Sequence, residues 1–184
     1  MSKIILAVVG LPGAGKTEIV EYLKNKTNWP GVYFGDVTFD EMKKEGLEIN
    51  EANERKTREE IRKNLGMGAY AILSVPKVQE LFKNSSVIVE SLYSWEEYLE
   101  MKKEFGDIFK VLAVFSSPET RIKRMVNRPI RPLHREDVIS RDYAQIENVH
   151  QAGPIARADF MIVNEESKED LYKQIDKVIE KLTK

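Results

Sequence analysis

The feature that most constrains the fold is a glycine-rich stretch that follows an apolar run near the start of the chain. Residues 4–9 are apolar and mostly β-branched, which predicts a buried strand. Residues 10–17 read GLPGAGKT and match the pattern G-x-x-x-x-G-K-[ST] at every fixed position. Because the residues that follow have helical spacing, this order of strand, glycine-rich loop and helix predicts a phosphate-binding P-loop.

The chemistry of such a loop explains its residue types. Glycines let successive backbone N–H groups converge on an anion, and the positive end of the following helix adds to the attraction. Lys16 is expected to reach the β- and γ-phosphates of ATP, and the Thr17 hydroxyl is expected to ligate Mg²⁺. The loop alone does not distinguish ATP from GTP. The predicted nucleotide-binding residues of the loop are Gly10, Pro12, Gly13, Ala14, Gly15, Lys16 and Thr17.

Further apolar runs alternate with helical segments along the rest of the chain. Each run is short, rich in β-branched residues and followed by a segment with polar faces, which predicts an α/β fold with a parallel sheet covered by helices. The last segment carries a single apolar stripe at three- and four-residue intervals, typical of a helix that packs on a sheet. The further strands are expected at residues 32–34, 87–89, 111–115 and 160–163.

About fifty residues separate the strands predicted at 32–34 and 87–89, far more than a simple crossover needs. Residues 50–64 and 69–83 have helical character, with Pro76 as an expected kink or boundary. The segment therefore predicts an inserted helical subdomain. The chain is expected to form one domain over residues 1–184, with a core at 1–36 and 86–184, the insertion at 37–85 and a small lid at about 127–141.

An acidic residue is expected beside the loop. P-loop proteins hold the magnesium ion, directly or through water, with an acidic residue at the end of a neighbouring strand. Glu90 follows the strand predicted at 87–89, so Thr17 and Glu90 are the predicted metal ligands. The alternative is that Glu90 is an ordinary acid at a strand end.

Arginines form a third group. Arg121, Arg124 and Arg128 share one face of a predicted helix, and Arg131, Arg135 and Arg141 extend the cluster. Such a set can close over a polyphosphate and stabilise the transition state. The alternative is a solvated face that pairs with acidic neighbours. We expect Lys16, Arg124 and Arg128 to act in catalysis and Arg121 to contact the nucleotide.

Composition limits the partners of the chain. Its 184 residues include 32% charged residues, which cancel to a formal charge of −1, so bulk charge does not favour nucleic acid or an anionic membrane. The absence of cysteine excludes disulfides and thiolate metal sites. The apolar run at 4–9 is too short for a signal peptide or a membrane span. We expect a cytoplasmic protein whose partner is a small molecule.

Taken together, these motifs resemble the nucleotide-kinase group. The chain looks similar to dephospho-CoA kinase, to adenylate kinase and to an uncharacterised, largely archaeal kinase-like family related to both. The resemblance implies a five-stranded parallel sheet, an acceptor-binding insertion and an arginine-bearing lid. It also implies that Asp36 lies near the acceptor and that Asn164 borders the adenine. Besides the loop, it rests on GD at 35–36, VIVE at 87–90, SPETR at 117–121 and ADFMIVN at 158–164.

The chain departs from this group at two positions. Adenylate kinases carry acceptor-binding arginines shortly after the positions of Asp36 and Glu90, but residues 37–40 and 91–94 contain none. A hydroxyl acceptor, as in dephospho-CoA kinase, would instead use a carboxylate base such as Asp36. A helix cap is the alternative role for Asp36. Arg55, Arg58 and Arg62 form a stripe that either binds acceptor phosphates or pairs with Glu51 and Glu54 on a solvated helix.

Three functions follow from these residues. The first is an ATP-dependent kinase, similar to dephospho-CoA kinase, that phosphorylates a nucleotide-like acceptor. The second is a nucleoside monophosphate kinase. The third is a nucleotide-dependent binding module or slow NTPase that has no small acceptor, which the missing arginines favour.

Overall fold

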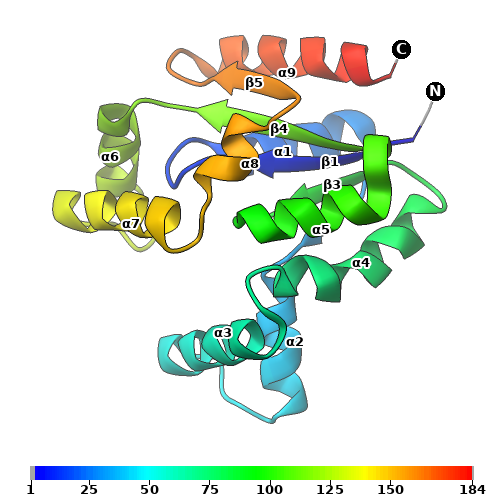
Figure 1. Cartoon of the computed structure of the whole chain (residues 1–184). Coiled ribbons are helices and arrows are strands. Elements are labelled where there is room, and N and C mark those ends of the chain that lie inside the picture. Colours follow the sequence, from blue (N-terminus) through cyan, green and yellow to red (C-terminus); the bar gives the residue numbers. More distant parts are fainter. Residues whose placement is uncertain (1–2, 184) are drawn as a thin grey trace.

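The computed structural model describes residues 3–183, in which one parallel sheet carries helices on both faces (Figure 1). The strand order is β2-β3-β1-β4-β5, so the predicted five-stranded parallel sheet is confirmed. Strand β1 lies at the centre, which buries all five of its residues. The strands are β1 (Ile5–Val9), β2 (Gly31–Tyr33), β3 (Val87–Glu90), β4 (Phe109–Phe115) and β5 (Phe160–Val163).

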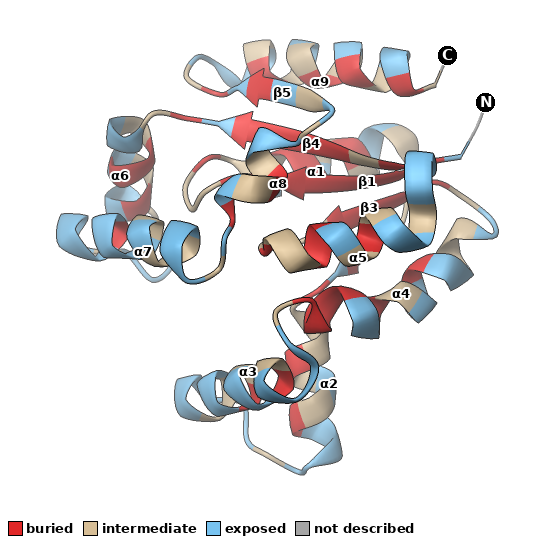
Figure 2. Ribbon diagram, in the orientation of Figure 1, coloured by how far each residue is buried: buried red, intermediate tan, exposed pale blue. Residues whose placement is uncertain are grey.

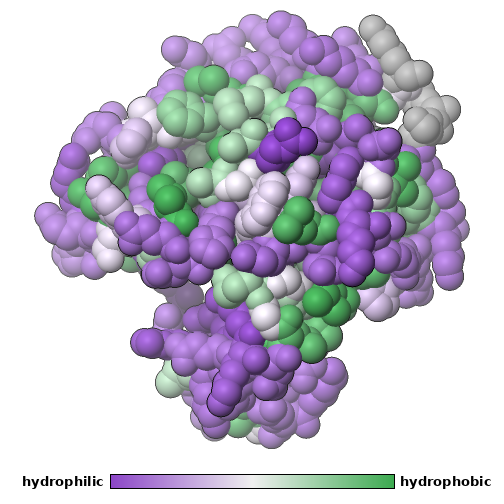
Figure 3. All heavy atoms as spheres, viewed as in Figure 1, coloured by the Kyte–Doolittle hydropathy of each residue, from purple (hydrophilic) through white to green (hydrophobic). Residues whose placement is uncertain are grey.

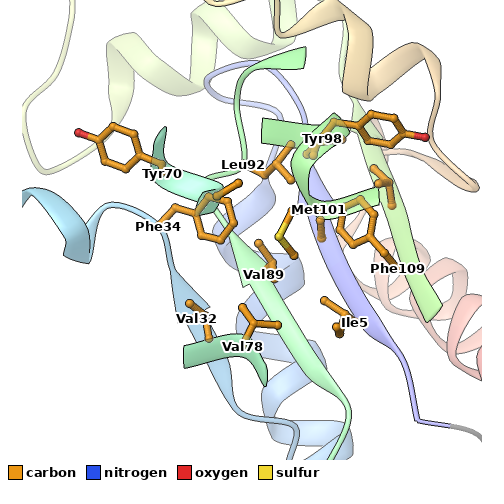
Figure 4. Close-up of a cluster of buried hydrophobic side chains, with 14 of the residues drawn as sticks. Ile5, Val32, Phe34, Tyr70, Val78, Val89, Leu92, Tyr98, Met101 and Phe109 are labelled. Atoms are coloured by element: carbon orange, nitrogen blue, oxygen red, sulfur yellow. The ribbon is translucent and has the colours of Figure 1, made fainter. Parts of the chain in front are cut away.

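The alternation of side chains along β1 supplies both layers of the core. Ile5, Ala7 and Val9 pack in one cluster, whereas Leu6 and Val8 pack in the other. Figure 2 shows this buried band running through the sheet and the inner faces of its helices. The first cluster also contains side chains from β2, β3 and the helices that cover them, which Figure 4 shows in detail.

Different helices cover the two faces. Helices α1 (Lys16–Thr27) and α9 (Lys168–Leu182) cover one face, and the predicted apolar stripe of α9 is buried against it at Leu171, Ile175 and Val178. The opposite face is covered by α4 (Ala69–Phe82), α5 (Trp95–Phe105) and α8 (Ala152–Ala156). A short 3₁₀ turn, η1 (Gly106–Ile108), links α5 to β4.

The segment predicted as an insertion holds three helices. Helices α2 (Asp36–Lys44) and α3 (Glu51–Leu65) project away from the sheet, with a mostly hydrophilic outer surface (Figures 1 and 3). Helix α4 returns the chain to the sheet. It continues through Pro76, so the alternative that Pro76 marks a helix boundary is wrong.

The segment predicted as a lid spans parts of two further helices and the loop that joins them. It includes the end of α6 (Pro118–Asn127), a connecting loop and the first half of α7 (Arg135–Glu147). A small cluster of Ile122, Met125 and Val138 joins the two helices. Within residues 3–183, no helix is both long enough and apolar enough to cross a membrane.

Candidate functional site

The P-loop connects the end of β1 to the start of α1, and its backbone requires glycine. Gly13 and Gly15 have φ values of 80° and 106°, which side chains strongly disfavour. A Cβ atom at Gly13 would also lie 2.9 Å from the carbonyl oxygen of Arg121. Gly15 is the N-cap of α1, and no side chain caps this helix end. The first N–H groups of α1 therefore remain available for an anion.

Lys16 begins α1 and folds back over the loop. Its Nζ donates hydrogen bonds to the carbonyl oxygens of Gly10 at 2.6 Å and Leu11 at 3.2 Å. Burial, with a smaller contribution from the charge of Arg121, lowers the pKa of Lys16 to about 8. The ammonium is thus held in a poorly solvated position, where the negative charges of a polyphosphate would stabilise it strongly.

This lowered pKa predicts proton uptake when a nucleotide binds. At pH 9, we expect wild-type protein to take up nearly one proton per ATP bound, because phosphates beside Lys16 raise its pKa again. Calorimetric titrations in two buffers with different ionisation enthalpies measure this uptake. Lys16→Arg is the control, since a guanidinium stays charged at this pH. Equal uptake by wild type and Lys16→Arg would contradict the assignment.

Side chains from outside the loop hold its carbonyl oxygens in place. Arg121 donates to the carbonyl of Pro12 at 3.2 Å and to that of Ser116 at 3.1 Å. Asn164 donates to the carbonyl of Ala14 at 2.8 Å, and Gln151 donates to that of Gly10 at 3.0 Å. These contacts fix the loop from behind, which leaves its other side free for phosphate.

Two of these braces were expected to contact the nucleotide. Arg121 is instead buried, and its guanidinium forms an ion pair of 2.6 Å with Asp142 of α7. Asn164 is also buried against the loop. Arg124, expected in catalysis, donates to Ser116 Oγ at 2.9 Å and to the carbonyl of Asn164 at 3.0 Å. In this structure all three bind the backbone of the loop or of the segments beside it, so their roles toward the nucleotide stay predictions.

A cavity of about 460 Å³ opens beside the loop, and we call it the phosphate cavity. Lys16, Thr17 and Glu90 all line it. Glu90 reaches it because the parallel register pairs Val8 of β1 with Glu90 at the end of β3. The Glu90 carboxylate forms an ion pair with Lys24 of α1. The predicted metal ligands thus lie at one cavity.

The donor set fits a magnesium ion that is bound partly by phosphates. Within residues 3–183, no group of three His, Cys, Asp or Glu side chains could hold a metal. Mg²⁺ commonly takes only one or two protein ligands and completes its shell with phosphates and water. Thr17 and Glu90 can supply those ligands, and the ion would neutralise charge on the phosphates.

Arginines of the lid segment reach the same cavity. Arg128 and Arg141 line it, with Arg141 contributed by α7. Arg128 donates to the carbonyl of Arg131 at 2.6 Å, whereas Arg141 makes no ion pair within the described part of the chain. Arg135 lies elsewhere, paired with Glu119 at 2.8 Å. Of the predicted arginine cluster, Arg128 and Arg141 are the members that line the phosphate cavity.

A second cavity, of about 310 Å³, adjoins the first, and we call it the insertion cavity. Four residues line both cavities, so the two cavities adjoin across these side chains. The remaining walls come from α2, α3, α4 and α5, including the side chains of Thr38, Arg58, Arg62, Tyr70 and Glu97. The shared residues are Tyr33, Ser91, Tyr93 and Gln145.

Asp36 does not line either cavity. It is the first residue of α2, and its carboxylate forms an ion pair of 3.2 Å with Lys77 of α4. The N-cap of α2 is Gly35, so the alternative role of Asp36 as a cap is wrong. The side chain is 46% exposed, and its partner is Lys77 on α4. This placement does not support its expected role as a base.

Sequence reasoning missed Glu97. Ser94 and Glu97 form a capping box at the start of α5, a signature visible in the sequence as S-x-x-E. The Glu97 Oε2 atom accepts hydrogen bonds from the backbone N–H groups of Tyr93 at 2.6 Å and Ser94 at 3.0 Å. Burial raises the pKa of Glu97 to about 7 despite these bonds. The sequence pattern S-x-x-E predicts the capping role of Glu97, but it does not predict that Glu97 lies at the insertion cavity.

The braced loop, the open helix end and the phosphate cavity define a P-loop nucleotide-binding protein with a kinase-like fold. Residues 9–140 match a family model described as AAA domain. A UPF0200 protein of Thermococcus onnurineus is 34% identical over 97% of this chain and 98% of its own. A UPF0200 protein of Methanocaldococcus jannaschii is 33% identical over an alignment that covers 97% of this chain and 90% of that protein. The chain belongs to the UPF0200 family.

Solved structures share the fold at low sequence identity. A shikimate kinase from Bacteroides thetaiotaomicron has a TM-score of 0.62 at 14% identity and covers 100% of both chains. A gluconokinase from Sinorhizobium meliloti has a TM-score of 0.56 at 12% identity, covering 98% of this chain and 95% of its own. These likenesses establish the kinase-like fold.

Proposed function

We propose that this protein is a kinase that transfers the γ-phosphoryl group of ATP to a small acceptor held in the insertion cavity. The observation that carries the proposal is that the two cavities adjoin and share the lining residues Tyr33, Ser91, Tyr93 and Gln145. An acceptor in the insertion cavity would therefore face the terminal phosphate of a nucleotide bound at the P-loop. The related folds of a shikimate kinase and a gluconokinase support the same class of reaction.

The reaction needs charge stabilisation and alignment more than covalent chemistry. An acceptor oxygen forms a bond to the γ-phosphorus while the bond from that phosphorus to the β–γ bridging oxygen breaks. The electron pair of the broken bond leaves with ADP, and a hydroxyl acceptor releases its proton to water. Lys16, Arg128 and Arg141 stabilise the charge on the phosphates. Thr17 and Glu90 would hold Mg²⁺, which would neutralise part of the phosphate charge, and Arg121, Arg124 and Asn164 keep the loop in shape.

The acceptor oxygen belongs to a hydroxyl group in our proposal, as in dephospho-CoA kinase, since residues 37–40 and 91–94 lack the arginines of an adenylate kinase. A nucleoside monophosphate acceptor is the alternative. Because Asp36 pairs with Lys77 outside the cavity, the proposal no longer assigns it the role of base.

ADP release measured with a coupled assay tests the proposal. We expect at least one acceptor among dephospho-CoA, nucleoside monophosphates, hydroxy acids and sugars to raise the rate about tenfold or more above that with ATP alone. Lys16→Met should remove this stimulation. If every acceptor leaves the rate at the level of ATP alone, the kinase proposal fails. The second candidate, a nucleotide-dependent binding module, is favoured by the missing arginines and predicts that outcome.

A further inference from the structure

The insertion cavity carries more positive charge than its protein partners neutralise. Arg58 and Arg62, one helical turn apart on α3, both line it. Arg58 forms one ion pair, with Glu54 of the same helix at 3.2 Å. Arg62 forms no ion pair within residues 3–183, and its Nε atom is buried without a hydrogen-bond partner. A buried guanidinium donor without an acceptor is costly, and an anion in the cavity that Arg62 lines would offset part of that cost through its charge.

The surroundings of Arg62 hold it at this position. Its guanidinium lies 5.4 Å from the centre of the Tyr70 ring, within range of a cation–π interaction. The Tyr70 hydroxyl is in turn fixed by a 2.7 Å hydrogen bond with Thr38 Oγ1. Arg62 is thereby oriented by neutral groups, which leave its charge uncompensated.

The one other carboxylate at this cavity, Glu97, neutralises Arg62 only in part, although the charge of Arg62 acts to lower the pKa of Glu97. The Oε2 atom of Glu97 is engaged by two backbone N–H groups of its capping box. Burial favours the protonated form of Glu97 and raises its pKa to about 7, so its negative charge is partial at neutral pH. Two guanidinium groups therefore face one paired carboxylate and one partly protonated one.

The size of the cavity limits what can enter. Its volume of about 310 Å³ corresponds to roughly ten water molecules at about 30 Å³ each. That space accepts a single ring or a short polyol with one anionic group. Aromatic side chains of Tyr33, Phe39, Tyr70 and Tyr93 supply flat walls for such a moiety.

We infer that the part of the acceptor bound in the insertion cavity is a compact moiety with an oxyanion, either a carboxylate or a phosphate, which Arg62 binds with help from Arg58. This inference rests on the proposed kinase function and names its substrate class. The anion anchor lies on the insertion helix α3, in place of the arginines that residues 37–40 and 91–94 lack. Arginine suits this role because its planar fork binds carboxylates and phosphates through two parallel hydrogen bonds.

Nuclear magnetic resonance of the Arg62 Nε–H group tests the inference directly. The protein is first saturated with Mg²⁺ and the non-hydrolysable analogue AMP-PNP, so that added anions do not enter the P-loop. Ribose 5-phosphate and D-gluconate are then titrated separately to distinguish a phosphate from a carboxylate, with ribose and D-glucitol as neutral counterparts. The resonance is assigned by its loss in Arg62→Lys.

We expect at least one of the two anions to shift this resonance saturably at millimolar concentration, whereas neither neutral compound does. Arg62→Met should weaken binding of that anion, measured by calorimetry, about tenfold or more. Arg55→Met is the matched control, because Arg55 lies on the same helix but is 76% exposed and pairs with Glu59. It should change the affinity less than about twofold.

Three outcomes would overturn the inference: no saturable shift with either anion, equal shifts with the neutral compounds, or unchanged affinity in Arg62→Met. Failure of the kinase function gives a different result. If an anion binds through Arg62 but no acceptor stimulates ADP release, the anion site stands and the kinase proposal fails. If only neutral acceptors stimulate release, the kinase stands and the anion site fails.

Discussion

Lys16→Met is expected to lower acceptor-stimulated ADP release by about a hundredfold or more and to weaken ATP binding by about tenfold or more. Methionine keeps the length and the apolar stem of the side chain but removes the ammonium. The loss follows from position: Nζ lies 2.6 Å from the carbonyl oxygen of Gly10 at the mouth of the loop, where the β- and γ-phosphates would bind. Removing that charge leaves the transferring group with one fewer stabilising partner.

Thermal unfolding gives a readout of this change that does not depend on knowing the acceptor. A ligand that binds only the folded protein stabilises it by about 2.7 kcal/mol when present at a hundred times its dissociation constant. Saturating ATP and Mg²⁺ should therefore raise the melting temperature of wild type and much less that of Lys16→Met. Lys26→Met is the control, since Lys26 lies on α1 but pairs with Asp176 at 3.2 Å. Equal stabilisation of wild type and Lys16→Met by ATP would refute the assigned role.

The fold was predictable because its signals are local. An apolar run followed by GLPGAGKT specifies a strand, a loop and a helix within about fifteen neighbouring residues. Glu90 was placed correctly beside the loop because of a general rule about parallel sheets. The carboxyl ends of parallel strands meet at one edge of the sheet, so the residue type and the strand end were sufficient.

The arginines show why helical spacing is not sufficient for the site. Arg121 and Arg124 do lie on α6, and Arg128 follows as its C-cap in an extended conformation. Helical spacing alone cannot state what packs against the helix. Asp142 of α7 and the carbonyls of the P-loop engage Arg121, while Arg128 reaches the phosphate cavity. These differences depend on how α6 packs against α7 and the loop, which are tertiary contacts.

The arginine stripe of α3 gives a sharper example. Arg55 and Arg62 are seven residues apart, so they share one side of the helix but are separated by about 10 Å along its axis. Arg55 therefore lies out in solvent beside Glu59, whereas Arg62 lies at the insertion cavity. The solvated-helix alternative holds for Arg58, which pairs with Glu54, while Arg55 pairs with Glu59 instead of Glu51. Binding of acceptor phosphates by Arg62 stays a prediction. The different surroundings of Arg55 and Arg62 depend on where α3 lies relative to the sheet, which helical spacing does not specify.

Glu97→Gln is expected to change how stability depends on pH. The pKa of Glu97 is about 7 in the folded protein, compared with an ordinary value of 4.5, so the folded state holds this proton more tightly than the unfolded state. The resulting stabilisation is complete below pH 4.5 and is lost as the pH rises through 7. Glutamine does not ionise, and it can still accept a backbone hydrogen bond in a capping box.

Relative to wild type, the variant should therefore gain about 3 kcal/mol of unfolding free energy between pH 4.5 and pH 8.5, from about 1.4 kcal/mol per pKa unit. Urea unfolding of both proteins across this range measures the difference. Glu100→Gln is the matched control, because Glu100 lies on the same helix and pairs at the surface with Lys103. If the curves of wild type and Glu97→Gln stay parallel, the Glu97 carboxyl is solvated, and Arg62 then faces a full negative charge. The stability measurement thus also tests the charge balance from which the anionic acceptor was inferred.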